Sequence, residues 1–325
     1  MTDYRIIFRT PGDAQVLERE DIVAPTPGPG EAVVRHDAIG LNYIDTYHRS
    51  GLYPVTLPSP IGGEGAGVVE AVGEGVKQVQ VGDRVVYAGV GMGSYSTVRA
   101  INAEGLVKLP DAIDGRTAAA SFLKGLTADM LVGGCGKVQP GQTILVHAAA
   151  GGMGSLLVQW IHAIGATVIA HAGSAEKAAK ARALGADHAL SCPFDELAAE
   201  VRRLTNGHGV DTVIDGVGKA SWDASLDSLA KRGLMISYGN ASGAVPSFAP
   251  LELMRRGSLF LTRPTMGDYS DTPADRGAAA KRLFDMIASG KLKIEIGQTF
   301  ALADAADAHR ALEARQTTGS TVLLP

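Results

Sequence analysis

One short segment limits the fold of this 325-residue chain more than any other: residues 143–155, which read TILVHAAAGGMGS. An apolar strand runs there into a glycine turn and then directly into a helix. Glycines let a backbone approach a pyrophosphate closely, and a helix N-terminus presents unpaired N–H groups with partial positive charge. Ala149 stands where the first glycine of the G-x-G-x-x-G fingerprint would be, whereas Gly151 and Gly154 occupy the second and third positions. The segment predicts a dinucleotide site; a tight strand-to-helix turn without a ligand is the alternative.

The same alternation continues through the middle of the chain, where short apolar strands are separated by helix-like stretches with glycines at the joints. Such a pattern favours a parallel sheet covered on both faces. We therefore predict a doubly wound α/β domain over residues 125–264. Its expected helices are 153–164, 176–184 and 221–230, and its expected strands are 143–147, 167–170, 210–215 and 234–238.

The rest of the chain has a different sequence pattern. Up to about Lys124 it shows short β-like runs separated by glycine, proline and aspartate turns, which predicts a barrel-like, all-β region. After Pro264 an amphipathic helix carries Leu283, Phe284 and Ile287 on one face, and a strand over residues 321–324 ends the chain. A terminal strand needs a sheet to join, so we expect it to return to the N-terminal region. The predicted domains are 1–124 with 265–325, and 125–264; the length also favours two domains.

Composition and charge exclude several classes of function. The net charge is −4 and no run of basic residues forms a stripe for a nucleic-acid backbone, so no nucleic-acid partner is expected. No segment is apolar for the length of a bilayer, and charged residues interrupt the first ten positions, which argues against a signal peptide. Two cysteines, Cys135 and Cys192, are too few for a four-cysteine zinc site or a disulfide framework. We expect a cytoplasmic protein without membrane contact.

The end of the second predicted strand selects the cofactor. A site selective for NAD places an acidic residue there to bind the ribose 2′-hydroxyl. Residues 171–177 read HAGSAEK instead, with small residues at the tip and Lys177 in the first turn of a helix. That arrangement suits a 2′-phosphate and predicts NADPH. Glu176 weakens the positive field, and Lys177 as an ordinary solvated helix residue is the alternative.

Four segments in chain order, residues 40–54, 121–127, 148–154 and 261–265, resemble the zinc-independent NADPH:quinone oxidoreductases of the medium-chain dehydrogenase/reductase superfamily, the group that includes zeta-crystallin. The resemblance covers essentially the whole chain. It implies a GroES-like β-rich catalytic domain built from both termini, a Rossmann NADPH-binding domain inserted between them, and an active site in the cleft. It also implies a homodimer formed through the Rossmann sheets.

Carried over position by position, the resemblance implies two sets of site residues. The residues around the nicotinamide and the acceptor would be Asn42, Asp45, Tyr47, Tyr53 and Arg263. The cofactor-binding residues would be Asn42, Thr127, Ala150, Gly151, Gly152, Met153, Gly154, Gly173, Ser174, Lys177, Tyr238, Gly239 and Asn240. One departure is that relatives often have a tyrosine near the adenosine phosphate where this chain has Cys192, which weakens the 2′-phosphate assignment.

No metal site is expected. Zinc alcohol dehydrogenases of the same superfamily hold their catalytic zinc with a cysteine and a histidine, because zinc prefers thiolate and imidazole ligands. Those positions are Asn42 and Gly63 here, and the carboxylate of Glu64 alone does not make a zinc site. Without a Lewis acid, alcohol oxidation is difficult, whereas reduction of a quinone needs mainly hydride positioning and hydrogen-bond donors.

The sequence therefore predicts an NADPH-dependent reductase of a small, flat quinone. A reductase of α,β-unsaturated carbonyls on the same fold, and a structural protein that binds the cofactor with little turnover, are the alternatives. The sequence does not decide the physiological acceptor or one- against two-electron transfer.

Overall fold

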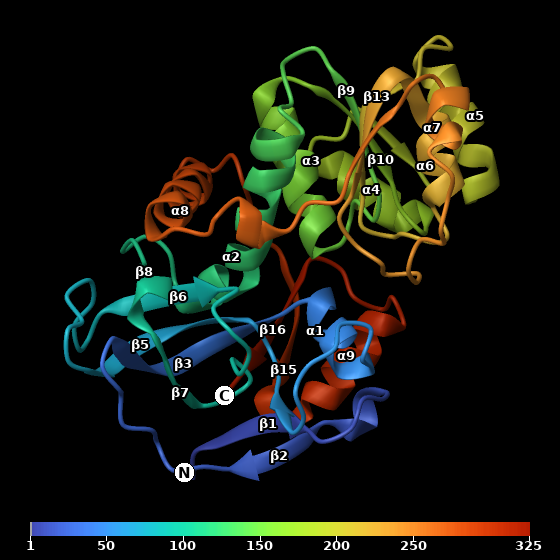
Figure 1. Cartoon of the computed structure of the whole chain (residues 1–325). Helices are drawn as coiled ribbons and strands as arrows, with labels where there is room; N and C mark the ends of the chain where they lie inside the picture. The colour runs from blue at the N-terminus through green and yellow to red at the C-terminus, as the bar shows by residue number, and fades with distance from the viewer. Residues whose placement is uncertain (1) are drawn as a thin grey trace. The chain divides into compact units, whose positions relative to one another are not determined.

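The computed structural model describes residues 2–325 and divides into two compact units (Figure 1). The N-terminal unit comprises the chain up to Leu126 together with Thr272–Ala288 and Ile294–Pro325. The central unit comprises Thr127–Asp271 and Ser289–Lys293.

The central unit is built on six parallel strands in the order β11-β10-β9-β12-β13-β14. Numbered along the unit, this is the order 3-2-1-4-5-6 of dinucleotide-binding sheets, with its topological switch point between β9 and β12. The strands are β9 (Thr143–Val146), β10 (Thr167–His171), β11 (His188–Leu190), β12 (Val210–Asp215), β13 (Leu229–Ser237) and β14 (Phe260–Thr262). The predicted doubly wound domain is thus confirmed.

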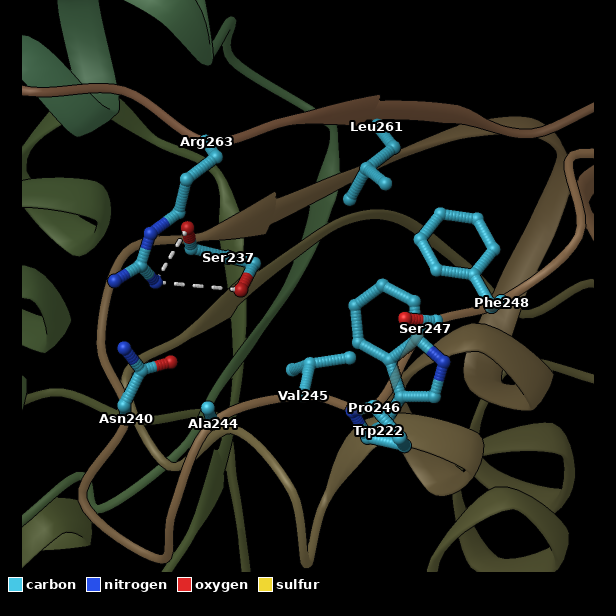
Figure 2. Close-up of a pocket in the computed structure, with 10 residues that line it drawn as sticks. All are labelled: Trp222, Ser237, Asn240, Ala244, Val245, Pro246, Ser247, Phe248, Leu261 and Arg263. Atoms are coloured by element: carbon cyan, nitrogen blue, oxygen red, sulfur yellow. Dashed lines mark hydrogen bonds between the residues drawn. The ribbon is translucent and has the colours of Figure 1, made fainter.

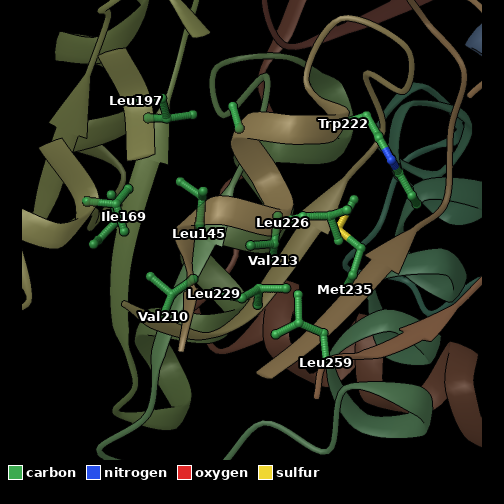
Figure 3. Packing of buried hydrophobic residues seen from close by; sticks show 12 residues of the cluster. Leu145, Ile169, Leu197, Val210, Val213, Trp222, Leu226, Leu229, Met235 and Leu259 are labelled. Carbon is green, nitrogen blue, oxygen red and sulfur yellow. The ribbon is translucent and has the colours of Figure 1, made fainter. Parts of the chain in front are cut away.

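Helices join these strands and cover the sheet. They are α3 (Gly152–Ile164), α4 (Ala175–Ala183), α5 (Phe194–Leu204), α6 (Trp222–Ser228) and α7 (Leu251–Arg255), with a π-helical turn at Met130–Cys135 and a 3-10 turn at Met266–Asp268. Figure 3 shows Leu145 of β9, Val213 of β12 and Met235 of β13 in one buried cluster with Leu226 of α6. Because the strands are apolar on both faces, helices can pack on both.

The helix predicted over residues 221–230 ends earlier than expected. It stops at Ser228, and Leu229 and Ala230 already belong to β13, where Leu229 pairs with Val210. The guanidinium of Arg202 donates to the carbonyl oxygens of Asp227 at 3.0 Å and Leu229 at 2.7 Å. These carbonyls are therefore held by a side chain from α5 instead of by a continuing helix.

The N-terminal unit contains two sheets. The larger has the order β15-β16-β3-β5-β6-β8, with β7 also paired to β3, and the smaller has the order β2-β1-β4. The final strand β16 lies antiparallel to β3 (Figure 1), which confirms that the end of the chain returns to the N-terminal sheet. The strands are β1 (Tyr4–Phe8), β2 (Glu18–Asp21), β3 (Glu31–Leu41), β4 (Ser59–Pro60), β5 (Glu64–Val72), β6 (Arg84–Ala88), β7 (Val98–Asn102), β8 (Val107–Lys108), β15 (Ile296–Ala301) and β16 (Ser320–Leu324).

The prediction of an all-β region up to Lys124 was wrong in two places. Helix α1 (Tyr43–Ser50) follows β3 directly, and helix α2 (Gly115–Asp129) begins before Lys124. The Asp45 carboxylate accepts a hydrogen bond from the backbone N–H of Asn42 at 2.9 Å, and Gly51 ends α1 in the left-handed conformation. Helices α8 (Pro273–Ala288) and α9 (Ala305–Glu313), with 3-10 turns at 14–16, 103–105 and 302–304, complete the unit. Within residues 2–325, none of the helices has the length and apolarity that crossing a membrane requires.

Candidate active site

The glycine turn lies at the carboxyl end of β9, at the switch point of the central sheet. The backbone N–H of Gly151 donates to the Ala148 carbonyl at 2.9 Å, and Ala148 takes a left-handed φ of 49°. A Cβ on Gly154 would lie 2.3 Å from that same carbonyl oxygen, so only glycine fits there. The turn therefore brings α3 against the strand end, as the third glycine of the fingerprint requires.

The start of α3 presents an anion-binding surface. Gly151 is the N-cap residue, and the first turn carries no acidic side chain. Gly151, Gly152 and Met153 are partly exposed, whereas Ala150 is buried beneath them. The first N–H groups of a thirteen-residue helix, without a carboxylate beside them, favour a bound phosphate.

The end of β10 leads into a second helix N-terminus. Ser174 caps α4, and its Oγ accepts a hydrogen bond from the Lys177 backbone N–H at 3.2 Å. No atom lies within 4 Å of where a Cβ on Gly173 would stand, so there is open space beside the cap. Glu176 forms an ion pair with Lys180 at 3.5 Å, one turn along the exposed face of the helix. Gly173, Ser174 and Lys177 are thus grouped at one helix start.

Residues 238–240 and Arg263 form a third group, at the carboxyl ends of β13 and β14. Nη1 of Arg263 donates to the carbonyl oxygens of Ser237 at 2.9 Å and Gly239 at 3.1 Å, which ties the two strand ends together. Figure 2 shows Arg263 and Asn240 at one end of a pocket of about 520 Å³. The opposite end of the pocket is apolar and is lined by Trp222, Val245, Phe248 and Leu261.

The buried acid Asp215, at the carboxyl end of β12, was not predicted from the sequence. Asp215 ends β12, and its Oδ1 accepts from the backbone N–H groups of Val217 at 2.7 Å and Gly218 at 3.1 Å. Its Oδ2 accepts from Ser225 Oγ at 2.7 Å, and that hydroxyl lies 2.8 Å from Nε2 of His147. His147 is therefore a buried structural residue, whose pKa is lowered to about 4 by burial. The network fixes the loop after β12 against the glycine turn.

In the N-terminal unit, Asn42 and Glu64 are hydrogen-bonded to each other. Nδ2 of Asn42 donates to Oε2 of Glu64 at 2.7 Å, and the backbone N–H of Leu123 donates to Oε1 at 2.6 Å. The ammonium of Lys124 lies 3.8 Å from Oε2. Glu64 is fully buried, and burial raises the pKa of its carboxyl. Sequence reasoning placed Lys124 at a domain boundary and within the resembling segment 121–127, but did not name it as a site residue.

Asp45 lies in a second buried network. Besides accepting from the Asn42 backbone, its Oδ2 accepts from the Tyr95 hydroxyl at 3.0 Å. The Tyr95 oxygen lies 3.1 Å from Nε2 of His309, and Nδ1 of His309 lies 3.1 Å from Nη1 of Arg49. Burial raises the pKa of Asp45 to about 7 and lowers that of His309 to about 3. Tyr95, His309 and Arg49 were not predicted, because no local pattern connects them to Asp45.

The two predicted tyrosines pack against each other near Asn42. The rings of Tyr47 and Tyr53 meet edge to face with centroids 5.2 Å apart, and the Tyr53 backbone N–H donates to the Tyr47 carbonyl at 3.0 Å. Tyr47 is buried and Tyr53 is partly exposed. Asn42, Asp45, Tyr47 and Tyr53 are therefore brought together at α1, whereas Arg263 belongs to the central unit.

Across residues 2–325, no three His, Cys, Asp or Glu side chains gather as metal ligands would.

A GroES-like unit together with a six-stranded dinucleotide-binding sheet defines the medium-chain dehydrogenase/reductase class. Two family matches agree: residues 28–111 match the alcohol dehydrogenase GroES-like domain, and residues 184–323 match the zinc-binding dehydrogenase family. Within that class, the chain belongs to the quinone oxidoreductase family.

Three relatives illustrate the similarity. The chain is 50% identical over 322 residues to a quinone oxidoreductase of Pseudomonas aeruginosa, covering 99% of both chains. The crystal structure of Escherichia coli quinone oxidoreductase complexed with NADPH matches with a TM-score of 0.96 at 43% identity, covering 99% of this chain and 100% of that one. A 2-haloacrylate reductase of Burkholderia sp is 42% identical over 313 residues, covering 94% of each chain.

Proposed function

We propose that this protein is an NADPH-dependent quinone reductase that needs no metal. The observation that carries the proposal is the 50% identity with a quinone oxidoreductase over 99% of both chains, which leaves no large segment of either protein unmatched. The residues at the zinc-ligand positions of the superfamily support it, because Asn42 and Gly63 replace the cysteine and histidine, and Asn42 is hydrogen-bonded to Glu64.

The residues of the central unit fit NADPH. Gly154 has no room for a side chain beside Ala148, the α3 N-terminus is free of acidic groups, and open space adjoins Gly173. We propose that Ala150, Gly151, Gly152, Met153 and Gly154 hold the pyrophosphate and that Gly173, Ser174 and Lys177 hold the 2′-phosphate. Thr127, Tyr238, Gly239, Asn240 and Asn42 would line the remainder of the cofactor. When bound, NADPH supplies the hydride.

For the acceptor, we propose hydrogen-bond donors among Asn42, Tyr47, Tyr53 and Arg263. Asn42, Tyr47 and Tyr53 gather at α1, with Asp45 beneath them, and Arg263 carries the guanidinium next to Asn240. Donors of this kind polarise a carbonyl and stabilise the negative charge that develops on its oxygen. We propose that residues 1–124 with 265–325 form the catalytic domain and that residues 125–264 form the cofactor domain.

A reductase of activated alkenes is the second candidate, favoured by the 42% identity with a 2-haloacrylate reductase over most of both chains. Both reactions deliver a hydride to an electron-poor π-system conjugated to an oxygen. The same donors could serve either acceptor, so activity must distinguish them.

We further propose a cytoplasmic homodimer. Strand β14 is the edge of the central sheet and exposes 60% of Phe260, and helix α7 before it exposes Met254 and Leu251. An exposed strand edge with apolar neighbours favours pairing with a second copy. Both cysteines are free thiols, which suits a reducing compartment.

The test is optical: oxidation of NADPH and of NADH is followed with 1,4-benzoquinone, a naphthoquinone, an enal and 2-chloroacrylate, with a chelator present throughout. We expect the fastest turnover with NADPH and a quinone. Activity with the alkenes alone would favour the second candidate, and the absence of quinone turnover with either nucleotide would contradict the first.

A further inference from the structure

One buried cation near Asn42 is only loosely paired. Lys124 lies in α2 and is 8% exposed, and its Nζ makes no hydrogen bond to any group among residues 2–325. Its nearest ion-pair partner is Oε2 of Glu64, at 3.8 Å. An ammonium carries three N–H donors. A buried donor without an acceptor costs free energy, and more so when it is charged.

Glu64 does not explain this placement by itself. Its Oε1 already accepts from the Leu123 backbone and its Oε2 from Asn42. The carboxylate also lies close against Gly40: a Cβ there would come within 2.1 Å of Oε2. Glu64 therefore balances the charge of Lys124 at a distance and leaves its N–H donors for another acceptor.

The neighbouring groups restrict what that acceptor can be. Asn42 is hydrogen-bonded to the same Glu64 oxygen that faces Lys124, so the ammonium lies beside a residue proposed to contact the acceptor. Asp45 is also close enough for its charge to interact with that of Lys124. Because Glu64 and Asp45 already supply carboxylates here, the ligand needs no carboxylate of its own. The Lys124 ammonium would instead stabilise an acceptor oxygen that becomes negative during reduction.

We propose that Lys124 is a catalytic residue of the quinone reductase, whose ammonium binds the acceptor oxygen that gains negative charge and then protonates it. This rests on the proposed function. A quinone takes up two electrons and two protons in becoming a hydroquinone. The hydride delivers both electrons and one proton; the second proton passes from Lys124 Nζ to the remaining oxyanion, so that an N–H bond breaks and an O–H bond forms. The neutral amine then regains a proton from solvent.

The competing explanation is that Lys124 only balances the charge of Glu64. The double variant Glu64→Gln with Lys124→Met separates the two, because it removes both charges together. A simple counter-ion predicts that the double variant recovers most of the turnover lost in Lys124→Met. The proposal predicts that the double variant turns over as slowly as Lys124→Met alone.

The experiment compares Lys124→Met, Lys124→Arg and the double variant with wild type. Lys108→Met is the matched control, since Lys108 is 54% exposed and pairs with Asp83 in the same unit. Turnover of NADPH with 1,4-benzoquinone gives kcat and KM, and the absorption of 4-nitrophenol, with NADP⁺ saturating, reports binding of a phenolate. Thermal unfolding shows whether each variant is folded.

We expect Lys124→Met to lower kcat by about 100-fold, which is within the range for loss of a general acid or an oxyanion donor. Phenolate affinity should fall at least tenfold. Lys124→Arg should retain phenolate affinity within about threefold but lose at least tenfold in kcat, because a guanidinium does not give up its proton in proteins. Lys108→Met should match wild type.

Turnover by Lys124→Met within threefold of wild type would overturn the inference. Unchanged phenolate affinity in Lys124→Met, or no detectable phenolate binding by wild type, would overturn it too. Recovery of turnover in the double variant would have the same consequence. If Lys124→Met does not fold, Lys124→Arg decides: unchanged kcat overturns the proposal. A wild-type protein that is silent with every quinone would instead contradict the proposed function itself.

Discussion

A Cβ on Gly154 would lie 2.3 Å from the carbonyl oxygen of Ala148, and 2.6 Å from the Cα of Ala149. These atoms are backbone, so they cannot move aside as a flexible side chain would. The close approach sets how tightly α3 begins against β9, and hence where its free N–H groups point.

Gly154→Ala should therefore weaken NADPH binding by at least tenfold and lower the melting temperature by several degrees. Overpacking of this kind costs about 1–3 kcal/mol. The measurement is NADPH affinity by fluorescence titration together with thermal unfolding. Gly133→Ala is the control, because nothing lies within 4 Å of a Cβ there. Equal effects of the two substitutions would contradict this account of the turn.

Lys177 provides a test of cofactor selectivity. It lies in the first turn of α4, three residues after the N-cap residue Ser174. Lys177→Ala should raise KM for NADPH about tenfold and KM for NADH less than twofold, because only NADPH carries the 2′-phosphate. Lys231→Ala, at an exposed position of β13, is the control. A parallel rise in both KM values would remove Lys177 from the phosphate site.

The central domain was predictable because its signals are local. The strands β9, β10, β12 and β13 contain short apolar runs, and the helices α3, α4 and α6 were also placed from the sequence, whereas β11, β14, α5 and α7 were not predicted. The strand order is not local: β9 pairs with β12 across more than 60 residues. It follows from the resemblance and from the rules of parallel sheets, and no single segment encodes it.

Helix α1 had a signal that was overlooked. Asn42 with an acidic residue three positions later, and Gly51 after the last turn, are the cap residues of a short helix. The segment was included in the predicted all-β region because the runs around it are short and β-like. The partners of Asp45 had no such signal, because Tyr95 and His309 come from segments 50 and 264 residues further along, which meet only through the fold.

The bidentate pair between Arg49 and Glu313 should be important for stability. Arg49 is 2% exposed and donates to both oxygens of Glu313, at 2.9 and 2.7 Å. Glu313→Ala leaves the guanidinium buried without its carboxylate. Because the Glu313 side chain is 37% exposed, solvent screens part of the loss, and we expect about 1–2 kcal/mol rather than the larger cost of a fully buried pair.

Urea unfolding at neutral pH measures that loss. Asp307→Ala is the matched control in the same helix, since its ion pair with Arg310 is exposed and should contribute less than about 0.5 kcal/mol. A Glu313→Ala protein as stable as Asp307→Ala would show that Arg49 is held by its other acceptors, Gly12 and His309.

Asp45 should give the unfolding free energy an unusual pH dependence. Burial raises its pKa to about 7 in the folded protein, from 3.8 in the unfolded chain. Between these values the folded state holds a proton that the unfolded state has lost, so the folded state binds more protons and stability falls as pH rises. The contribution of Asp45 is thus most favourable below about pH 4 and is lost by about pH 7. The buried histidines His36 and His309 act in the opposite direction, because burial lowers their pKa values.

Comparison with Asp45→Asn removes those opposing contributions. The amide cannot titrate but keeps an oxygen to accept from the Asn42 backbone. The stability of wild type relative to Asp45→Asn should rise by a few kcal/mol as pH is lowered from 7 to 4, since each pKa unit corresponds to about 1.4 kcal/mol. Urea unfolding at several pH values measures the difference. Asp285→Asn, whose carboxylate is exposed and pairs with Lys281, should show no such slope. A difference that is flat, or that grows toward pH 7, would mean that Asp45 is ionised in the folded protein and that Lys124 and Tyr95 together compensate its charge.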